Sequence, residues 1–204
     1  MASAGFVHLH GHSEYSLLDG GCRVRQMAET AAELGMPAMA VTDHGNLFGI
    51  IEHYKACKEV GIKPIIGCEV YVAIESRYLR KAARGLAHAS NHLVLLAKNT
   101  TGYRNLTKLV SKGYTEGYYY NPRVDKELLR EYSEGLVCLS ACVSGEVPHM
   151  IQREGVTEAE KVAREYMEIF GDDYYLEIQR HGIDIEGKVN DGLLRLHKKL
   201  GVPL

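Results

Sequence analysis

Residues 33–45 read ELGMPAMAVTDHG, and the same order of features returns in residues 59–72, EVGIKPIIGCEVYV, and in residues 199–204, KLGVPL. In each stretch a helical segment reaches a glycine that can adopt the left-handed C-cap conformation. A proline then prevents further helix, and apolar residues suited to a buried strand follow. This order of residues is typical of the junction between a helix and a strand in an α/β protein.

The rest of the chain extends this alternation in both directions. Short apolar runs predict further strands at 6–10, 92–97, 136–140 and 174–179, with helical segments between most of them. We count six strands and the beginning of a seventh, which predicts a mainly parallel sheet, either open or closed into a barrel. In both forms the functional groups gather at the carboxyl ends of the strands. Because the sequence stops at Leu204, where a strand has only begun, we expect a fragment or a domain cut one strand early.

Composition limits the classes of function. A chain of 204 residues suits one domain, and 24 basic against 26 acidic residues leave no overall attraction to a polyanion, so any contact with nucleic acid must be local. Five cysteines without a CxxC pair argue against a disulfide framework and against a classical zinc finger. No apolar run reaches membrane-spanning length. We therefore expect a soluble, cytoplasmic protein without a membrane partner.

Three histidines, His8, His10 and His12, stand at alternate positions in the segment VHLHGHSEYSLLDG, and Asp19 follows them. If this segment is extended, all three imidazoles lie on one face, and two neighbouring ones can reach one cation. The alternative is that these histidines merely form hydrogen bonds in a polar loop. Spacing alone leaves the two interpretations about equally favoured.

Further groups that can bind a metal accompany the next strands. Asp43 and His44 end one strand, Glu69 lies in the next, His92 opens another, and Cys142 follows a fourth. Imidazole, carboxylate and thiolate are the usual ligands of zinc, manganese and iron. Each residue also has an ordinary explanation: a helix cap, a solvated carboxylate, a core histidine and a small buried thiol. A parallel topology would bring most of them to one rim, which favours a metal site.

Several segments resemble a known family. LHGHS, LLDG, AVTDHGNLFG, KPIIGCEVYV, HLVLLAKNTTGYRNL and LSACVSGE resemble the amino-terminal PHP (polymerase and histidinol phosphatase) domain of bacterial DNA polymerase III alpha subunits. The likeness spans nearly the whole chain, and segments without ligands, such as TGYRNL and EIQRHG, share it. It implies a PHP domain over residues 1–204 that is incomplete at its carboxyl end, without the palm, thumb and fingers of a polymerase.

The resemblance also implies a fold and a metal centre. The fold would be a distorted seven-stranded (β/α) barrel, cut at the start of the last strand, with up to three divalent ions at the carboxyl ends of the strands. The ligands implied are His10, His12, Asp19, His44, Glu69, His92 and Cys142. His8 falls outside this set, and a D-x-H pair expected in strand seven lies beyond the chain. The thiolate of Cys142 favours zinc, with manganese or iron as alternatives.

The activities implied by the resemblance belong to three classes. The domain could hydrolyse phosphoesters as a 3′ to 5′ proofreading exonuclease, it could be an independent PHP-family phosphatase, or it could serve as a non-catalytic module that docks a proofreading subunit. The parent protein would be a DNA-directed DNA polymerase of chromosomal replication. Its partners would be a single-stranded 3′ end or a primer-template, and replisome proteins such as a proofreading subunit and the sliding clamp.

Two segments raise the question of contact with DNA. The segment SRYLRKAARG at 76–85 could bring a phosphate backbone to the metal site, or it could be a solvated loop. Its basic residues are Arg77, Arg80, Lys81 and Arg84. GYYYNPR at 117–123 offers aromatic faces to bases, although tyrosines that pack on the outside of a barrel are commoner. Asp43 and His181 are expected to support the site by hydrogen-bonding its ligands.

Overall fold

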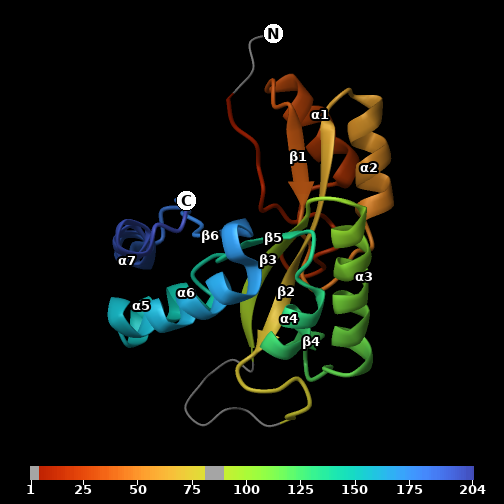
Figure 1. Cartoon of the computed structure of the whole chain (residues 1–204). Coiled ribbons are helices and arrows are strands. Elements are labelled where there is room, and N and C mark those ends of the chain that lie inside the picture. The colour runs from red at the N-terminus through yellow and green to blue at the C-terminus, as the bar shows by residue number, and fades with distance from the viewer. Residues whose placement is uncertain (1–4, 81–89) are drawn as a thin grey trace.

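The computed structural model describes residues 5–80 and 90–204. The elements found there, in chain order, are α1 (Val24–Glu33), β1 (Ala38–Val41), α2 (Ile50–Glu59), β2 (Lys63–Ala73), β3 (Ser90–Ala97), α3 (Thr100–Thr115), β4 (Arg123–Val124), α4 (Lys126–Tyr132), β5 (Leu136–Leu139), α5 (Glu146–Arg153), α6 (Val156–Phe170), the 3-10 helix η1 (Gly171–Asp173), β6 (Tyr174–Tyr175) and α7 (Asp184–Leu200). Figure 1 shows the strands at the centre, with α2 and α3 to one side and α5, α6 and α7 to the other. Among the described residues, no helix is both long and apolar enough to cross a membrane.

The strands form one sheet in the order β1-β2-β3-β5-β6, and the short strand β4 also pairs with β2. The pairs β1/β2, β2/β4 and β5/β6 are parallel, whereas β3 runs antiparallel to both of its neighbours. The expected parallel sheet is therefore correct for all strands except β3. This exception matters because the amino end of β3 lies at the same rim as the carboxyl ends of its neighbours.

The glycine and proline junctions form as expected. Gly35, Gly61 and Gly201 have φ angles of 75°, 80° and 74°, in the left-handed region that ends a helix. The first two lead into β1 and β2. After the third, the Leu176 N–H donates a hydrogen bond of 2.9 Å to the carbonyl oxygen of Pro203, so residues 202–204 lie beside the chain that follows β6.

The segment at 6–10, expected to be a strand, is irregular. It runs beside β1, where the Ala40 N–H donates to the His8 carbonyl (2.9 Å) and the Thr42 N–H donates to the Gly11 carbonyl (2.8 Å). The donors are two residues apart, but the acceptors are three apart, so one extra residue breaks the ladder as a β-bulge does. The strict alternation expected for the three histidines is therefore lost between His8 and Gly11.

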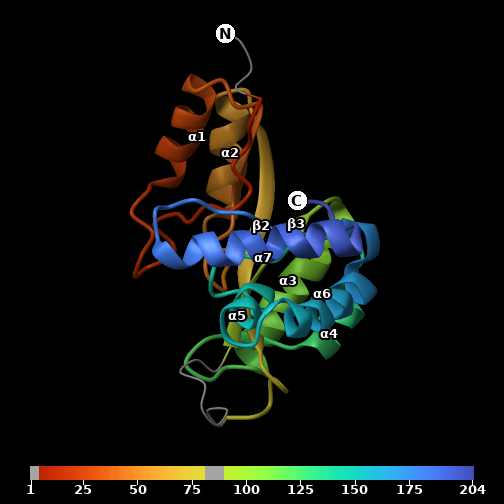
Figure 2. The same cartoon turned by 90° about the vertical axis from the view of Figure 1, so that its left-hand side faces the viewer.

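The two edges of the sheet face each other. The groove between them has a volume of about 570 Å³ and is lined by residues 6–10 on one side and by residues 175–181 and Leu204 on the other. The expected strand at 174–179 is regular only at Tyr174–Tyr175. The sheet thus curls as in a distorted (β/α) barrel. The largest apolar core lies between β2, β3 and β5 and helices α3 to α7, one of which, α7, crosses the front of Figure 2.

Candidate metal centre

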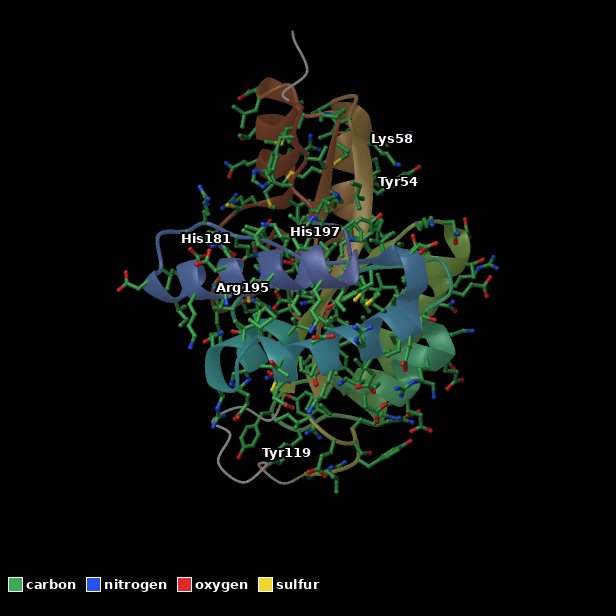
Figure 3. All side chains as sticks on the ribbon, turned by 60° about the vertical axis from the view of Figure 1, so that its left-hand side comes forward. Tyr54, Lys58, Tyr119, His181, Arg195 and His197 are labelled. Atoms are coloured by element: carbon green, nitrogen blue, oxygen red, sulfur yellow. The ribbon has the colours of Figure 1, made fainter. Side chains whose placement is uncertain are left out.

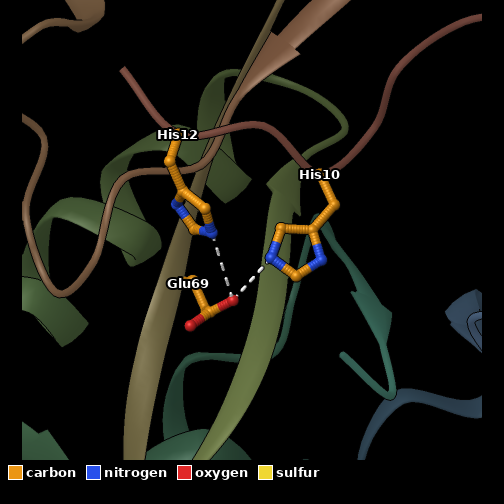
Figure 4. Close-up of side chains that lie close together, drawn as sticks. All are labelled: His10, His12 and Glu69. Carbon is orange, nitrogen blue, oxygen red and sulfur yellow. Dashed lines mark hydrogen bonds and ion pairs between the residues drawn. The ribbon is translucent and has the colours of Figure 1, made fainter. Parts of the chain in front are cut away.

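Glu69, in the middle of β2, is the centre of a cluster of histidines. Its side chain is 1% exposed, and its Oε2 lies 2.5 Å from Nε2 of His10 and 3.6 Å from Nε2 of His12. Its Oε1 lies 2.8 Å from Nδ1 of His44 and contacts Nδ1 of His92. Figure 4 shows the imidazoles of His10 and His12 converging on the carboxylate from one side. One buried carboxylate therefore contacts four imidazoles from distant parts of the chain.

The fold explains this convergence. His10 lies in the irregular stretch beside β1 and His12 follows it, and their rings meet edge to face with centroids 5.1 Å apart. His44 follows the end of β1, and its backbone bridges that of Glu69 in parallel fashion. His92 lies near the start of β3, and because β3 is antiparallel this end reaches the same rim. The ring of His8 instead lies edge to face with that of Phe6, at a centroid distance of 5.0 Å.

Two further predicted ligands extend the cluster at its margins. The Asp19 carboxylate, which is more than half exposed, lies 2.8 Å from Nε2 of His44. The Cys142 sulfur, in the loop after β5, lies 3.9 Å from Nδ1 of His92. All seven residues expected as ligands thus belong to one connected set of contacts.

Glu177 is a member of the cluster that the sequence analysis missed. Its Oε1 lies 2.7 Å from Nδ1 of His10, and the Gln179 side-chain amide contacts both groups, at 2.6 Å from Glu177 and 3.1 Å from His10. A signal was present, because Glu177 follows β6 as the other candidates follow their strands, and it lies in the segment EIQRHG that resembles the family. The ring of His10 is therefore held between two carboxylates.

The electrostatics of the cluster follow from these contacts. Burial alone would lower the pKa of His10, but hydrogen bonds to Glu177 and Glu69 raise this pKa to about 10. Burial opposes ionisation of Glu69 too, yet its hydrogen bonds to His10, His44 and His92 hold the carboxyl pKa well below the usual range. For His92, contacts with Cys142 and Glu69 outweigh burial and raise the pKa to about 9. The carboxylates thus provide the negative charge that a cation requires.

The donor atoms fit a metal ion. Two groups, each with its ligand atoms within 4.8 Å of one another, share Glu69: one is His10, His12 and Glu69, and the other is His44, Glu69 and His92. Two buried polar atoms of the cluster, His12 Nδ1 and Glu177 Oε2, have no hydrogen-bond partner within the described residues. Buried polar atoms normally have partners, and an ion is one explanation for such exceptions.

Asp43 supports the cluster differently from what was expected. Its buried carboxylate accepts hydrogen bonds of 2.7 Å from the Ser13 backbone N–H and from the hydroxyls of Ser13 and Ser16. The Ser16 hydroxyl in turn accepts from the backbone N–H of His44 at 3.1 Å. Asp43 therefore fixes the loop that carries Asp19 and contacts no ligand ring. It does not cap α2 either, because the N-cap of α2 is Gly49.

Neither His181 nor Arg77 is placed as expected. His181 lies before α7 (Figure 3), where its ring and its backbone N–H contact the carboxylate of Glu186, away from the cluster. Arg77 is 6% exposed and forms ion pairs with Asp125 and Glu116, so its guanidinium is turned inward rather than toward DNA. Arg80 is exposed, as a contact with a phosphate backbone would require. Lys81 and Arg84 lie outside the described residues.

Comparisons with known proteins identify the family. Residues 8–181 match the PHP domain family. The chain is 51% identical to DNA polymerase III subunit alpha of Treponema pallidum over 205 residues, and 46% identical to that of Thermus aquaticus over 199 residues. These alignments cover 100% and 97% of this chain, but it spans only 17% and 16% of the length of those relatives.

A solved structure shares the fold. A metal-dependent phosphoesterase from Bifidobacterium adolescentis superposes on the chain with a TM-score of 0.61 at 14% identity, covering 97% of this chain and 85% of that one. At this identity the likeness concerns the fold alone. The match to the family over residues 8–181 covers most of the chain. The chain belongs to the PHP domain family.

Proposed function

We propose that the chain is the PHP module of a bacterial replicative DNA polymerase and that its cluster of imidazoles and carboxylates holds divalent metal ions for phosphoester hydrolysis. The observation that carries the proposal is the contact of one buried carboxylate, Glu69, with four histidines. The likeness to polymerase III alpha subunits along the whole chain supports the assignment to a replicative polymerase. Copying DNA would be the work of regions outside these residues, in the cytoplasm, with DNA and replisome proteins as partners.

The proposed metal ligands are His10, His12, Asp19, His44, Glu69, His92 and Cys142. Because two groups of donors share Glu69, the site suits adjacent cations, up to three in all if further donors contribute. The sulfur of Cys142 favours zinc, and the nitrogen and oxygen donors also suit manganese or iron. Bound ions would lower the pKa of a coordinated water and neutralise charge on a phosphate.

The chain's own residues would orient the ligands. Glu177 and Gln179 hold Nδ1 of His10, which leaves Nε2 directed at Glu69 and the cluster. A carboxylate that accepts from one nitrogen of a ligating imidazole fixes the ring and makes the other nitrogen a better donor. Asp43 fixes the loop that carries Asp19, as described above.

The orienting role of Glu177 predicts a measurable defect. We expect Glu177→Gln to weaken divalent metal binding by about 10- to 100-fold, because a neutral amide polarises the His10 ring less than a carboxylate does. Metal affinity, measured by competition with a chromogenic chelator, checks this. Glu168→Gln, which changes an exposed carboxylate of α6, is the matched control. Equal affinities in the two variants would contradict the role.

The proposed activity is tested with two substrates. The protein is incubated with manganese or zinc and either a labelled single-stranded oligonucleotide or a small phosphomonoester. We expect metal-dependent shortening of the oligonucleotide from its 3′ end, as in a proofreading exonuclease. Hydrolysis of the monoester alone would support an independent phosphatase. Inactivity on both, with metal bound, would contradict hydrolysis and favour a structural module that docks a proofreading subunit.

A further inference from the structure

A cavity of about 560 Å³ adjoins the metal centre, and His92 belongs to both. Its wall also includes Tyr71, whose ring lies 5.3 Å from that of His92 and 6.1 Å from that of His44. Tyr119 and Tyr120, from the loop between α3 and β4, line the same cavity. The volume is within the range of about 300–1,000 Å³ that is typical of small-molecule sites. A ligand in this cavity would therefore lie directly beside the metal ligands.

The chemistry of the wall favours an uncharged aromatic group. Among the described residues that line the cavity, the ionisable groups are the two histidines and the tyrosine hydroxyls. Three carboxamides, those of Asn91, Asn121 and Gln152, contribute donors and acceptors that can contact the edge of a base. A phosphate would find no lysine or arginine among these residues. A nucleotide with its phosphate at the metal centre and its base in the cavity would match both the charged centre and the uncharged wall.

The backbone of a tight turn fixes the positions of Tyr119 and Tyr120. Tyr120 has a φ of 61°, a conformation unusual for a residue with a side chain, and it is 80% exposed. Its ring lies edge to face with that of Tyr119, at a centroid distance of 4.7 Å. The Tyr119 N–H donates to the carbonyl of Asn121 at 3.0 Å, which closes a tight turn. Both rings line the cavity, whereas the sequence alone favoured tyrosines that pack on the outside of the barrel.

Buried neighbours anchor this loop. The guanidinium of Arg123 is buried, donates to the backbone carbonyls of Gly117, Arg77 and Leu79, and lies 5.1 Å from the centre of the Tyr119 ring. Tyr119 is labelled at the bottom of Figure 3, where it projects from this loop. At the base of the loop, a Cβ added to Gly45 would meet Pro122 at 2.8 Å. The backbone just after His44 therefore packs closely against Pro122.

We propose that this cavity, with Tyr119 and Tyr120 as its aromatic wall, binds the base of a nucleotide whose phosphate lies at the metal centre. The inference rests on the proposed function and names its substrate class, a nucleotide at the end of a single strand. Stacking on tyrosine tolerates any base, because every base has a π face. The cavity would thus recognise an unpaired nucleotide without selecting its sequence.

The test uses 2-aminopurine, a fluorescent base whose emission is quenched when it stacks. The probes are a 2-aminopurine nucleoside monophosphate and a single-stranded oligonucleotide with 2-aminopurine at its 3′ end, each titrated with the zinc-loaded protein. We expect quenching with both probes and tighter binding of the oligonucleotide. Tyr119→Ala and Tyr120→Ala should each weaken binding about tenfold or more, whereas Tyr119→Phe and Tyr120→Phe should retain it.

Tyr118→Ala is the matched control, since Tyr118 is also exposed, belongs to the same loop, and stacks instead on Tyr114. If the three alanine variants bind the probes equally well, the inference is wrong, and the metal-dependent hydrolysis can still stand. Tighter binding of the mononucleotide than of the strand would overturn the assignment to a strand end. Because quenching needs no turnover, quenching without any hydrolysis would contradict the proposed function but support the cavity.

Discussion

The Glu69→Gln variant is expected to bind divalent metal at least about 100-fold more weakly than the unaltered protein and to lose metal-dependent hydrolysis. Removing a residue that only orients a metal ligand lowers metal affinity about 10- to 100-fold. Glu69 contacts four proposed ligands directly, so its effect should be larger. Glutamine keeps the shape of the side chain but removes its charge and replaces one acceptor oxygen with a donor. Both proposed metal groups would therefore lose their shared ligand.

The measurement is metal content by mass spectrometry after dialysis, together with affinity by competition with a chelator. Glu75→Gln is the matched control, because Glu75 is an exposed carboxylate just beyond the same strand. Thermal unfolding of both variants without metal separates lost ligation from lost structure. Metal content in Glu69→Gln equal to that in the control would refute the proposed centre.

Arg77→Met is expected to have the largest effect on stability. Nη1 of Arg77 lies 2.9 and 3.0 Å from the two oxygens of Asp125, and Nε lies 2.8 Å from Glu116. The Asp125 side chain is 3% exposed, and it also caps α4 by accepting from the Leu128 N–H at 3.1 Å. Methionine would fill much of the volume but leave this carboxylate buried without its cation.

Breaking a buried ion pair in this way costs about 3–5 kcal/mol, which in a chain of this size lowers the melting temperature by roughly 6–20 °C. Calorimetry or circular dichroism measures the change. Adding Asp125→Asn should restore part of the loss, since the unpaired charge is removed. Arg80→Met, at an exposed arginine in the same segment, should change stability little. An unchanged melting temperature for Arg77→Met, with weaker DNA binding, would instead favour the contact with DNA expected from sequence.

Much of the architecture could be predicted because its signals are local. The glycine and proline at 35–37 and at 61–64 end one helix and start one strand in each case, and most of the apolar residues after them are buried. These signals depend on backbone conformations available to only a few residue types. The same locality made His44 and Glu69 visible as candidates, because each follows or lies within an easily recognised strand.

The errors arose where a residue's role depends on distant neighbours. Spacing alone put His8 on the same face as His10 and His12, because no pattern in the segment itself reveals the extra residue between His8 and Gly11 that breaks the ladder with β1. The resemblance to the family had left His8 out of the ligand set. Arg77 looked like part of a basic surface, but its partners Glu116 and Asp125 lie 39 and 48 residues further along the chain. Glu177 was missed because its contact with His10 spans 167 residues.

The sequence by itself determined the helix and strand junctions, the residue types that accompany each strand and the resemblance to the family. Only the tertiary structure decided that β3 runs antiparallel, which brings His92 to the rim, and that Glu177 and the tyrosine loop adjoin the same centre. The reason is physical. Helix caps and turns depend on a few neighbouring residues, whereas strand direction, register and side-chain burial depend on pairing between segments that are far apart in the chain.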